Sequence, residues 1–106
     1  SNLDAYVNIV GGMRLDEHAA DLAVALSLVS GFKDVPIDDK TIVFGEIGLS
    51  GEIRSVSRIN ARISEAGRLG FTRCILPKSA LKQLSSCPSE LELCGVRSLR
   101  DAINLI

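Results

Sequence analysis

Few side chains in this sequence have the types and spacing that catalysis requires. The one histidine, His18, stands near the expected start of a helix, where a lone histidine is more often a surface or capping residue than a general base. The zinc-protease pattern H-E-x-x-H, the serine-hydrolase pattern G-x-S-x-G and the phosphate-loop ending G-K-[S/T] are absent from the sequence. An enzyme built on a familiar motif is therefore not expected.

A glycine-rich segment, Gly45-x-x-Gly48-x-x-Gly51, has the composition of a phosphate-binding loop. It lacks the following helix whose N-terminus would hold a phosphate, so we interpret its glycines as turn and bulge positions. Glu46 and Glu52 flank this turn and could form a carboxylate pair. Strand alternation favours the simpler interpretation, in which both are solvated charges at an edge.

The three cysteines, Cys74, Cys87 and Cys94, form an odd set without a C-x-x-C pair. This argues against a disulfide framework and against a zinc site, and it favours reduced thiols in a cytoplasmic protein. With no Trp, one Tyr and three Phe, the chain also lacks a platform for stacking single-stranded bases.

The net charge of −1 conceals a strong division along the chain. Residues 1–53 carry nine acidic and three basic side chains, net −6, whereas residues 54–82 carry seven basic ones against Glu65, net +6. Such a division can mark a nucleic-acid-binding face. The alternative is that the two blocks pair with each other in the fold, and the charges leave both interpretations open.

The length of 106 residues predicts one domain with a proper core, and no apolar run reaches the roughly 18 residues that a membrane span needs. We expect residues 1–4 to be a tag remnant or a disordered lead-in and residues 5–106 to form a single domain excised from a longer protein. No linker or internal repeat divides it.

Alternating helical and extended patterns predict an α+β fold. We expect strands at Tyr6–Val10 (stopped by Gly11-Gly12), at Thr41–Phe44, at Arg73–Leu76 (stopped by Pro77) and at Leu91–Val96. The strand that starts at Thr41 is expected to pair antiparallel with a strand from Glu52 to Val56, the two being joined through the turn between Gly48 and Gly51.

Four helices are expected to complete the fold. The first begins after an N-cap at Asp16, ends at Ser30-Gly31 and is apolar on nearly every side over Ala19–Val29, which predicts a buried helix. The second buries Ile59, Ile63, Ala66 and Leu69, exposes Arg58, Arg62, Glu65 and Arg68, and closes at Gly70. Short helices follow at Lys78–Leu84 and Leu99–Ile106.

Four segments carry a family resemblance, of which the third is the most specific: Val7–Gly12, Ala20–Ala23, Phe44–Arg54 and Arg62–Ala66. Together they resemble the C-terminal domain of the RadA (Sms) family of bacterial DNA repair proteins, a domain similar to the proteolytic domain of Lon proteases. The resemblance covers about residues 5–106. It implies a Lon-protease-like fold (ribosomal protein S5 domain 2-like), a sandwich of a mixed sheet and helices.

Lon peptidases use a Ser-Lys dyad, in which lysine is the general base for a serine nucleophile. By this resemblance the serine position holds Ala19 and the lysine position holds Asn60, and neither side chain can perform those steps. The resemblance therefore implies a domain without peptidase activity. The alternative is a Lon-type ATP-dependent serine peptidase with a degenerate site that uses Ser27, Ser30, Ser50, Ser55 or Ser57.

The family resemblance implies a hexameric DNA motor in recombinational repair and branch migration. ATP, Mg and Zn are expected to bind the missing part of that protein, a DNA-dependent ATPase, and none in this domain. Two roles stay open here. One is sequence-independent contact with duplex or branched DNA, for which the candidates are Arg54, Arg58, Arg62, Arg68, Arg73 and Lys78. The other is self-association into a ring, in which acidic and basic halves of neighbouring copies meet.

Overall fold

The computed structural model describes residues 17–106, and its elements follow the expected order, except that three strands rather than two lie between the first two helices. In chain order they are the 3₁₀ turn η1 (Glu17–Ala20), α2 (Asp21–Lys33), β1 (Thr41–Val43), β2 (Glu46–Ile47), β3 (Ile53–Arg54), α3 (Ile59–Arg68), β4 (Arg73–Pro77), the 3₁₀ helix η2 (Lys78–Gln83), β5 (Glu92–Val96) and α4 (Leu99–Ile103). The expected strand at Tyr6–Val10, its Gly11-Gly12 turn and the Asp16 N-cap lie outside the described residues.

Three parallel strands in the order β1-β4-β5 form the central sheet. The register pairs Ile42 with Cys74, and Cys74 with Leu93. Nearly every residue of β1 and β4 is buried, which explains their continuous apolar sequence, because a parallel strand is covered on both faces. The fold is thus mixed α and β around a parallel sheet, in agreement with the expected class at that level.

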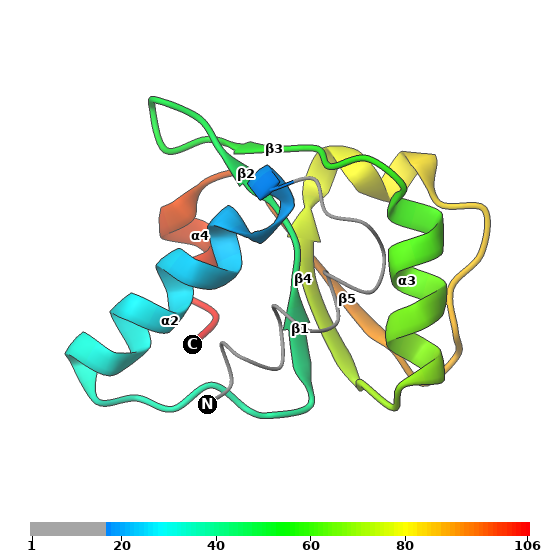
Figure 1. Cartoon of the computed structure of the whole chain (residues 1–106), viewed down its shortest axis with the longest axis horizontal. Coiled ribbons are helices and arrows are strands. Elements are labelled where there is room, and N and C mark those ends of the chain that lie inside the picture. Colours follow the sequence, from blue (N-terminus) through cyan, green and yellow to red (C-terminus); the bar gives the residue numbers. More distant parts are fainter. Residues whose placement is uncertain (1–16) are drawn as a thin grey trace.

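Helices cover the sheet on two sides, as Figure 1 shows: α2 and α4 lie on one side and α3 on the other. Because the strands are parallel, their carboxyl ends share one edge of the sheet. At that edge Figure 1 places β3, η2 and the start of α3. The opposite edge holds the starts of the strands and the end of α3.

Helix α2 differs from its expectation in two ways. It packs Leu22, Ala23 and Leu26 against the core, but Leu28 and Phe32 are 70% and 94% exposed, so it is not buried all round. The surface position of the helix is the reason, since only one face can reach the sheet. It also continues past Ser30-Gly31 to Lys33 and ends at Asp34, which adopts a left-handed conformation with φ of 57°.

The expected antiparallel hairpin is present but short, and its first strand is β2 rather than the strand that starts at Thr41, which as β1 pairs in parallel with β4. Glu46 lies opposite Arg54 and Ile47 opposite Ile53. Its start depends on Gly45, whose N–H donates to the Ala19 carbonyl at 3.0 Å, while Leu22 donates back to the Gly45 carbonyl. A Cβ at position 45 would lie 3.0 Å from Ile53 and 3.2 Å from Leu22. A glycine is therefore needed at position 45 because the chain packs closely against η1 and α2 there, and not because it forms a bulge.

Helix α3 confirms Ile59, Ile63 and Ala66 as its buried face, and Gly70 follows its end with φ of +90°. Two side chains were assigned to the wrong side. Leu69 is 45% exposed because the helix ends before it, and Arg62 is only 1% exposed. On the helical wheel Arg62 projects about 60° from Ile59, so it borders the apolar stripe rather than opposing it.

The last elements are close to expectation. The segment from Lys78 is a 3₁₀ helix that ends at Gln83, β4 includes Pro77, and α4 ends at Ile103 rather than Ile106. Ala102 is buried, and Leu99, Ile103 and Ile106 pack partly against the core. Within residues 17–106 no helix is long and apolar enough to cross a lipid bilayer.

Candidate functional site

The two positions that correspond to a Lon-type dyad carry structural roles here. Ala19 is fully buried in η1, and its carbonyl accepts the hydrogen bond from Gly45. The side chain of Asn60 lies on the first turn of α3, where its amide donates to the Gln83 carbonyl at 3.0 Å. Its oxygen accepts the Ser85 N–H at 2.8 Å and the Ser85 hydroxyl at 3.1 Å. Asn60 thus fastens the end of η2 to α3.

Within residues 17–106, the serines of the peptidase alternative make no hydrogen bond to a lysine or histidine side chain. Ser55 accepts a hydrogen bond from the Gln83 amide at 3.2 Å, and the Ser30 hydroxyl donates to the Val35 carbonyl. Across the part of the chain that is described, no serine hydroxyl bonds a lysine amine. His18 lies with Nδ1 3.8 Å from the Asp21 carboxylate, which also accepts the Ile47 N–H, so that carboxylate anchors the hairpin to α2.

The buried Cys74 is a poor candidate for a nucleophile. All three cysteines are free thiols. Burial is the main cause that raises the pKa of the Cys74 thiol far above its usual value, and the charges of Cys94 and Cys87 raise it further. In residues 17–106 no three His, Cys, Asp or Glu side chains gather as metal ligands would.

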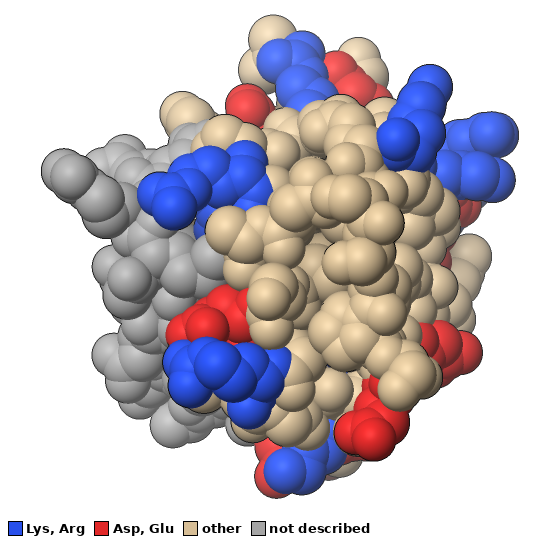
Figure 2. Space-filling model, turned by 90° about the vertical axis from the view of Figure 1, so that its right-hand side faces the viewer, with Lys and Arg blue, Asp and Glu red and all other residues tan. Residues whose placement is uncertain are grey.

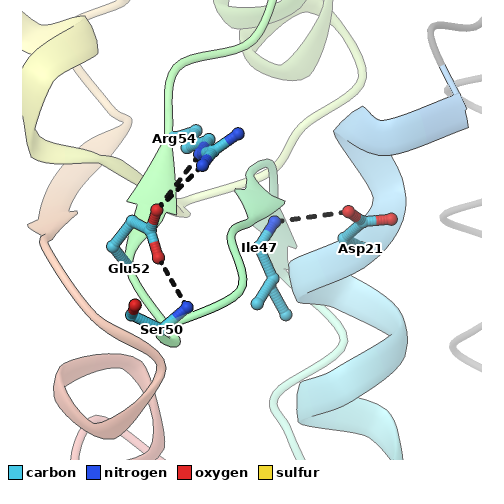
Figure 3. A network of polar contacts seen from close by, with 5 residues as sticks. All are labelled: Asp21, Ile47, Ser50, Glu52 and Arg54. Carbon is cyan, nitrogen blue, oxygen red and sulfur yellow. Dashed lines mark hydrogen bonds and ion pairs between the residues drawn. The ribbon is translucent and has the colours of Figure 1, made fainter.

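Glu46 and Glu52 do not form a carboxylate pair in the hairpin. Glu52 accepts the Ser50 N–H at 3.0 Å and two hydrogen bonds from Arg54, at 3.2 Å from Nε and 3.0 Å from Nη2 (Figure 3). Hydrogen bonds from its own N–H, from Arg54 and from the Ser50 N–H hold the pKa of the Glu52 carboxyl below its usual value. Glu52 therefore organises the turn and partly neutralises Arg54.

The six basic candidates do not share one surface. Arg62 is buried, where its Nε donates to the Ser57 carbonyl at 2.8 Å and its guanidinium lies 5.7 Å from the centre of the Phe44 ring. Its expected place on the solvent side of α3 was wrong. It connects α3 to the loop before it and to the end of β1.

Arg68 and Arg73 lie at the edge of the sheet where the strands begin. Arg68 donates from Nε to Glu65 at 2.7 Å, and this ion pair is exposed. Arg73 opens β4, and its Nη2 donates to the Leu105 carbonyl at 3.3 Å. Figure 2 shows the α3 side of the molecule, where Lys and Arg lie apart around a broad uncharged centre. The helix face is therefore not a basic surface.

The remaining candidates, Arg54, Arg58 and Lys78, belong to the opposite edge. There a pocket of about 500 Å³ is lined by Ile53, Lys78, Ser79, Leu81, Lys82, Val96 and Arg97. The pocket lies at the carboxyl ends of β4 and β5, since Lys78 follows one strand and Arg97 the other. Open parallel sheets bind ligands preferentially at this edge. We name Arg54, Arg58, Lys78, Lys82 and Arg97 the basic edge.

Two members of the basic edge were missed by sequence reasoning. Lys82 was counted in the basic block but not proposed as a site residue, and Arg97 stands outside that block. The signal that finds them is topological, because residues that follow neighbouring parallel strands meet at one edge. Arg58 also has an unusual, left-handed backbone conformation, with φ of 60° immediately before α3.

One family model and several curated proteins match this chain. A family model described as subunit ChlI of Mg-chelatase matches residues 6–80. DNA repair protein RadA of Halalkalibacterium halodurans is 47% identical over 104 residues, which are 98% of this chain and 22% of that protein. RadA of Streptococcus pneumoniae is 43% identical over 105 residues, 99% of this chain and 25% of that protein.

RadA of Bacillus subtilis is 43% identical over 102 residues, which are 96% of this chain and 22% of that protein. The chain therefore spans about a quarter or less of the length of the curated relatives that it matches. It is similar to one region of RadA proteins along nearly all of its own length. Since the family model matches well over half of the chain, the chain belongs to the family described as subunit ChlI of Mg-chelatase.

Proposed function

We propose that this chain is the non-catalytic, Lon-like C-terminal domain of a RadA-type DNA repair protein and that its basic edge contacts the DNA backbone. Relatives named DNA repair protein RadA match nearly all of the chain, which supports a role in DNA repair. The observation that carries the DNA contact is the meeting of Lys78, Lys82 and Arg97 around one pocket without an acidic lining residue.

The proposal of a non-catalytic domain rests on the chemistry at the two dyad positions. Ala19 has no oxygen that could attack a carbonyl, and it is buried. The amide of Asn60 cannot accept a proton as an amine does, and all of its hydrogen bonds serve the junction of α3 with η2. The site, rather than the fold, determines whether a Lon-like scaffold hydrolyses peptides.

Contact with DNA would be electrostatic and independent of sequence. Exposed Lys and Arg side chains bind phosphate oxygens, and the salt dependence of binding counts these contacts. The exposed aromatic side chain among the described residues, Phe32, lies on α2 and not at the basic edge. Without a recognition helix or aromatic side chains there, base reading is not expected.

The test is fluorescence anisotropy of a labelled DNA duplex with this chain across a salt series. Arg58→Gln with Lys78→Gln removes two cations from the basic edge. The matched control, Arg68→Gln with Arg73→Gln, removes two from the opposite edge. We expect the first pair to weaken binding and lower the salt slope by about two units, and the control pair to leave the slope unchanged. Equal effects of both pairs would contradict the proposal.

A second candidate function is assembly of the whole protein into a ring, for which a hexamer is expected. Val24, Leu28 and Phe32 favour it, because they recur every four residues along the outer side of α2 and are 39%, 70% and 94% exposed. Exposed apolar rows of this kind often mark protein contacts. Sedimentation of the full-length protein with Leu28→Ser and Phe32→Ser should show a smaller assembly, and an unchanged mass would oppose this role.

Other properties of the whole protein follow from the RadA relationship as proposals. We infer a cytoplasmic DNA-dependent ATPase that acts in recombinational repair and branch migration. ATP, Mg and Zn would bind regions of that protein beyond these residues. The chain would then act as a DNA-contacting and assembly domain attached to the motor.

A further inference from the structure

The pocket at the basic edge has a second chemistry that DNA contact does not use. Its exposed mouth is cationic, through Lys78, Lys82 and Arg97, but its lining also includes Ile53, Leu81 and Val96. Ile53 and Val96 are 7% and 2% exposed and Leu81 is half-buried, so the apolar side chains lie deeper than the cations. A phosphodiester backbone would pair with the mouth and leave this apolar floor unfilled.

Backbone hydrogen bonds on two sides of β3 hold the pocket in shape. The Ile53 N–H donates to the Arg97 carbonyl at 2.8 Å, and the Leu99 N–H donates to the Gly51 carbonyl at 2.8 Å. Gly95 lets η2 pack closely on β5, because a Cβ at that position would lie 2.8 Å from the Leu81 Cδ1 and 3.2 Å from the Lys78 Cα. The pocket is therefore a preformed feature of packed elements.

We propose that this pocket binds an acidic peptide segment of a partner protein, with one aliphatic side chain seated on the floor and flanking carboxylates paired with the cations at the mouth. Its volume of about 500 Å³ suits a side chain with adjacent backbone, within the usual range of roughly 300–1,000 Å³ for ligand pockets. The charged side chains that line the mouth are all positive, which favours carboxylates and steers their approach. The nearby Asp101 carboxylate accepts the Arg97 N–H at 3.2 Å and does not line the pocket.

This proposal goes beyond DNA contact but shares three cations with it. A bound acidic segment would occupy Lys78, Lys82 and Arg97 and would compete with DNA for the basic edge. The apolar floor separates the two proposals, since an aliphatic contact matters to a peptide and is immaterial to a phosphate backbone. The experiments can therefore contradict DNA binding and still support peptide binding, or contradict peptide binding and still support DNA binding.

The experiment uses the ¹⁵N-labelled chain and a probe peptide, Gly-Asp-Asp-Leu-Asp-Asp-Gly, in a chemical-shift titration. One control peptide replaces leucine with serine, and another replaces all aspartates with asparagine. We expect shifts at Ile53, Leu81 and Val96, binding at least about tenfold weaker with the serine peptide, and no measurable binding of the asparagine peptide. Shifts centred elsewhere, or equal affinity for the three peptides, would overturn the proposal.

Variants of the chain complete the test. Lys82→Gln should weaken the probe about two- to fivefold, whereas Lys40→Gln, at the opposite edge of the sheet, should not change it. Leu81→Ala should weaken the leucine peptide and leave duplex DNA binding unchanged, and the spectrum itself verifies folding. If Leu81→Ala has no effect on the leucine peptide, or if DNA and peptide depend on Leu81 equally, the apolar floor has no role in recognition.

Discussion

Arg62 shows how one residue can change an interpretation of a charged block. Seven cations in residues 54–82 make an attractive DNA-binding segment, yet this arginine is buried among the core and bonds the Ser57 carbonyl. A buried guanidinium beside an aromatic ring contributes through packing and directed hydrogen bonds. Arg62 therefore stabilises the start of α3, where Arg58 lies, and is not part of a surface that could bind a ligand.

Replacing Arg62 should cost stability rather than DNA affinity alone. Arg62→Ala should lower the free energy of unfolding by about 2–4 kcal/mol, because it opens a cavity and removes the bond to Ser57. Arg58→Ala, four residues earlier and exposed, should change stability by less than about 1 kcal/mol. Urea denaturation measures both, and equal effects of the two substitutions would contradict the buried role.

Glu52 gives the hairpin a defined pH dependence. Because hydrogen bonds hold its pKa below the usual value near 4.5, its contribution to folding is fully present above that value and is lost as pH falls through the lower, folded-state pKa. NMR titration of the Glu52 carboxyl should show this lowered pKa, and Arg54→Gln should move it upward. A Glu52 pKa that Arg54→Gln leaves unchanged would exclude the arginine as a cause.

At the scale of elements, the junction of α3 with η2 depends on Asn60. Its amide makes three hydrogen bonds to Gln83 and Ser85, and Gln83 in turn bonds Ser55. This network joins the hairpin exit, α3 and η2 at the basic edge. Asn60→Ala should lower the free energy of unfolding by about 1–2 kcal/mol, since exposed hydrogen bonds contribute modestly.

Ser64→Ala, on an exposed position of the same helix, is the matched control for Asn60→Ala. It should leave chemical denaturation curves nearly unchanged. The serine has no role in the junction of α3 with η2. If Asn60→Ala were as neutral as Ser64→Ala, the bonds to η2 would contribute nothing to folding.

The end of α2 offers a stabilising substitution. Asp34 has φ of 57°, and its negative charge lies at the C-terminus of the helix, where it opposes the helix dipole. Asp34→Gly should therefore raise the free energy of unfolding by about 1 kcal/mol. Asp34→Asn should raise it by less, since it removes the negative charge but keeps a side chain at a positive φ. Thermal unfolding distinguishes them, and a destabilised Asp34→Gly would show that the carboxylate has a favourable partner.

Much of the element order could be predicted because local patterns determine it. The stripe of Ile59, Ile63 and Ala66 defined α3, and turn glycines located the hairpin. The pairing of β1 with β4 could not be predicted, since it joins Ile42 to Cys74 across the chain and depends on how the helices pack. Arg97 was missed for the same reason, because its place beside Lys78 follows from the parallel pairing of β4 with β5.

At the scale of the whole molecule, the basic side chains group according to the edge of the sheet at which they lie, and not according to their half of the sequence. The basic block divides, with Arg68 and Arg73 at one edge and Arg54, Arg58 and Lys78 at the other. Lys82 and Arg97 strengthen only the second edge. A ligand with a linear array of anions would therefore meet its densest group of cations at the carboxyl ends of the strands.

The most direct test of this account is a chemical-shift map of a DNA duplex on the ¹⁵N-labelled chain at low salt. The account predicts shifts concentrated in residues 53–60, 78–83 and 97, which include all of the basic edge, and their loss as salt rises. The amides of residues 65–73 should change little. Shifts centred on α2 or on the end of α3, or a map without change at low salt, would contradict a DNA-contacting basic edge.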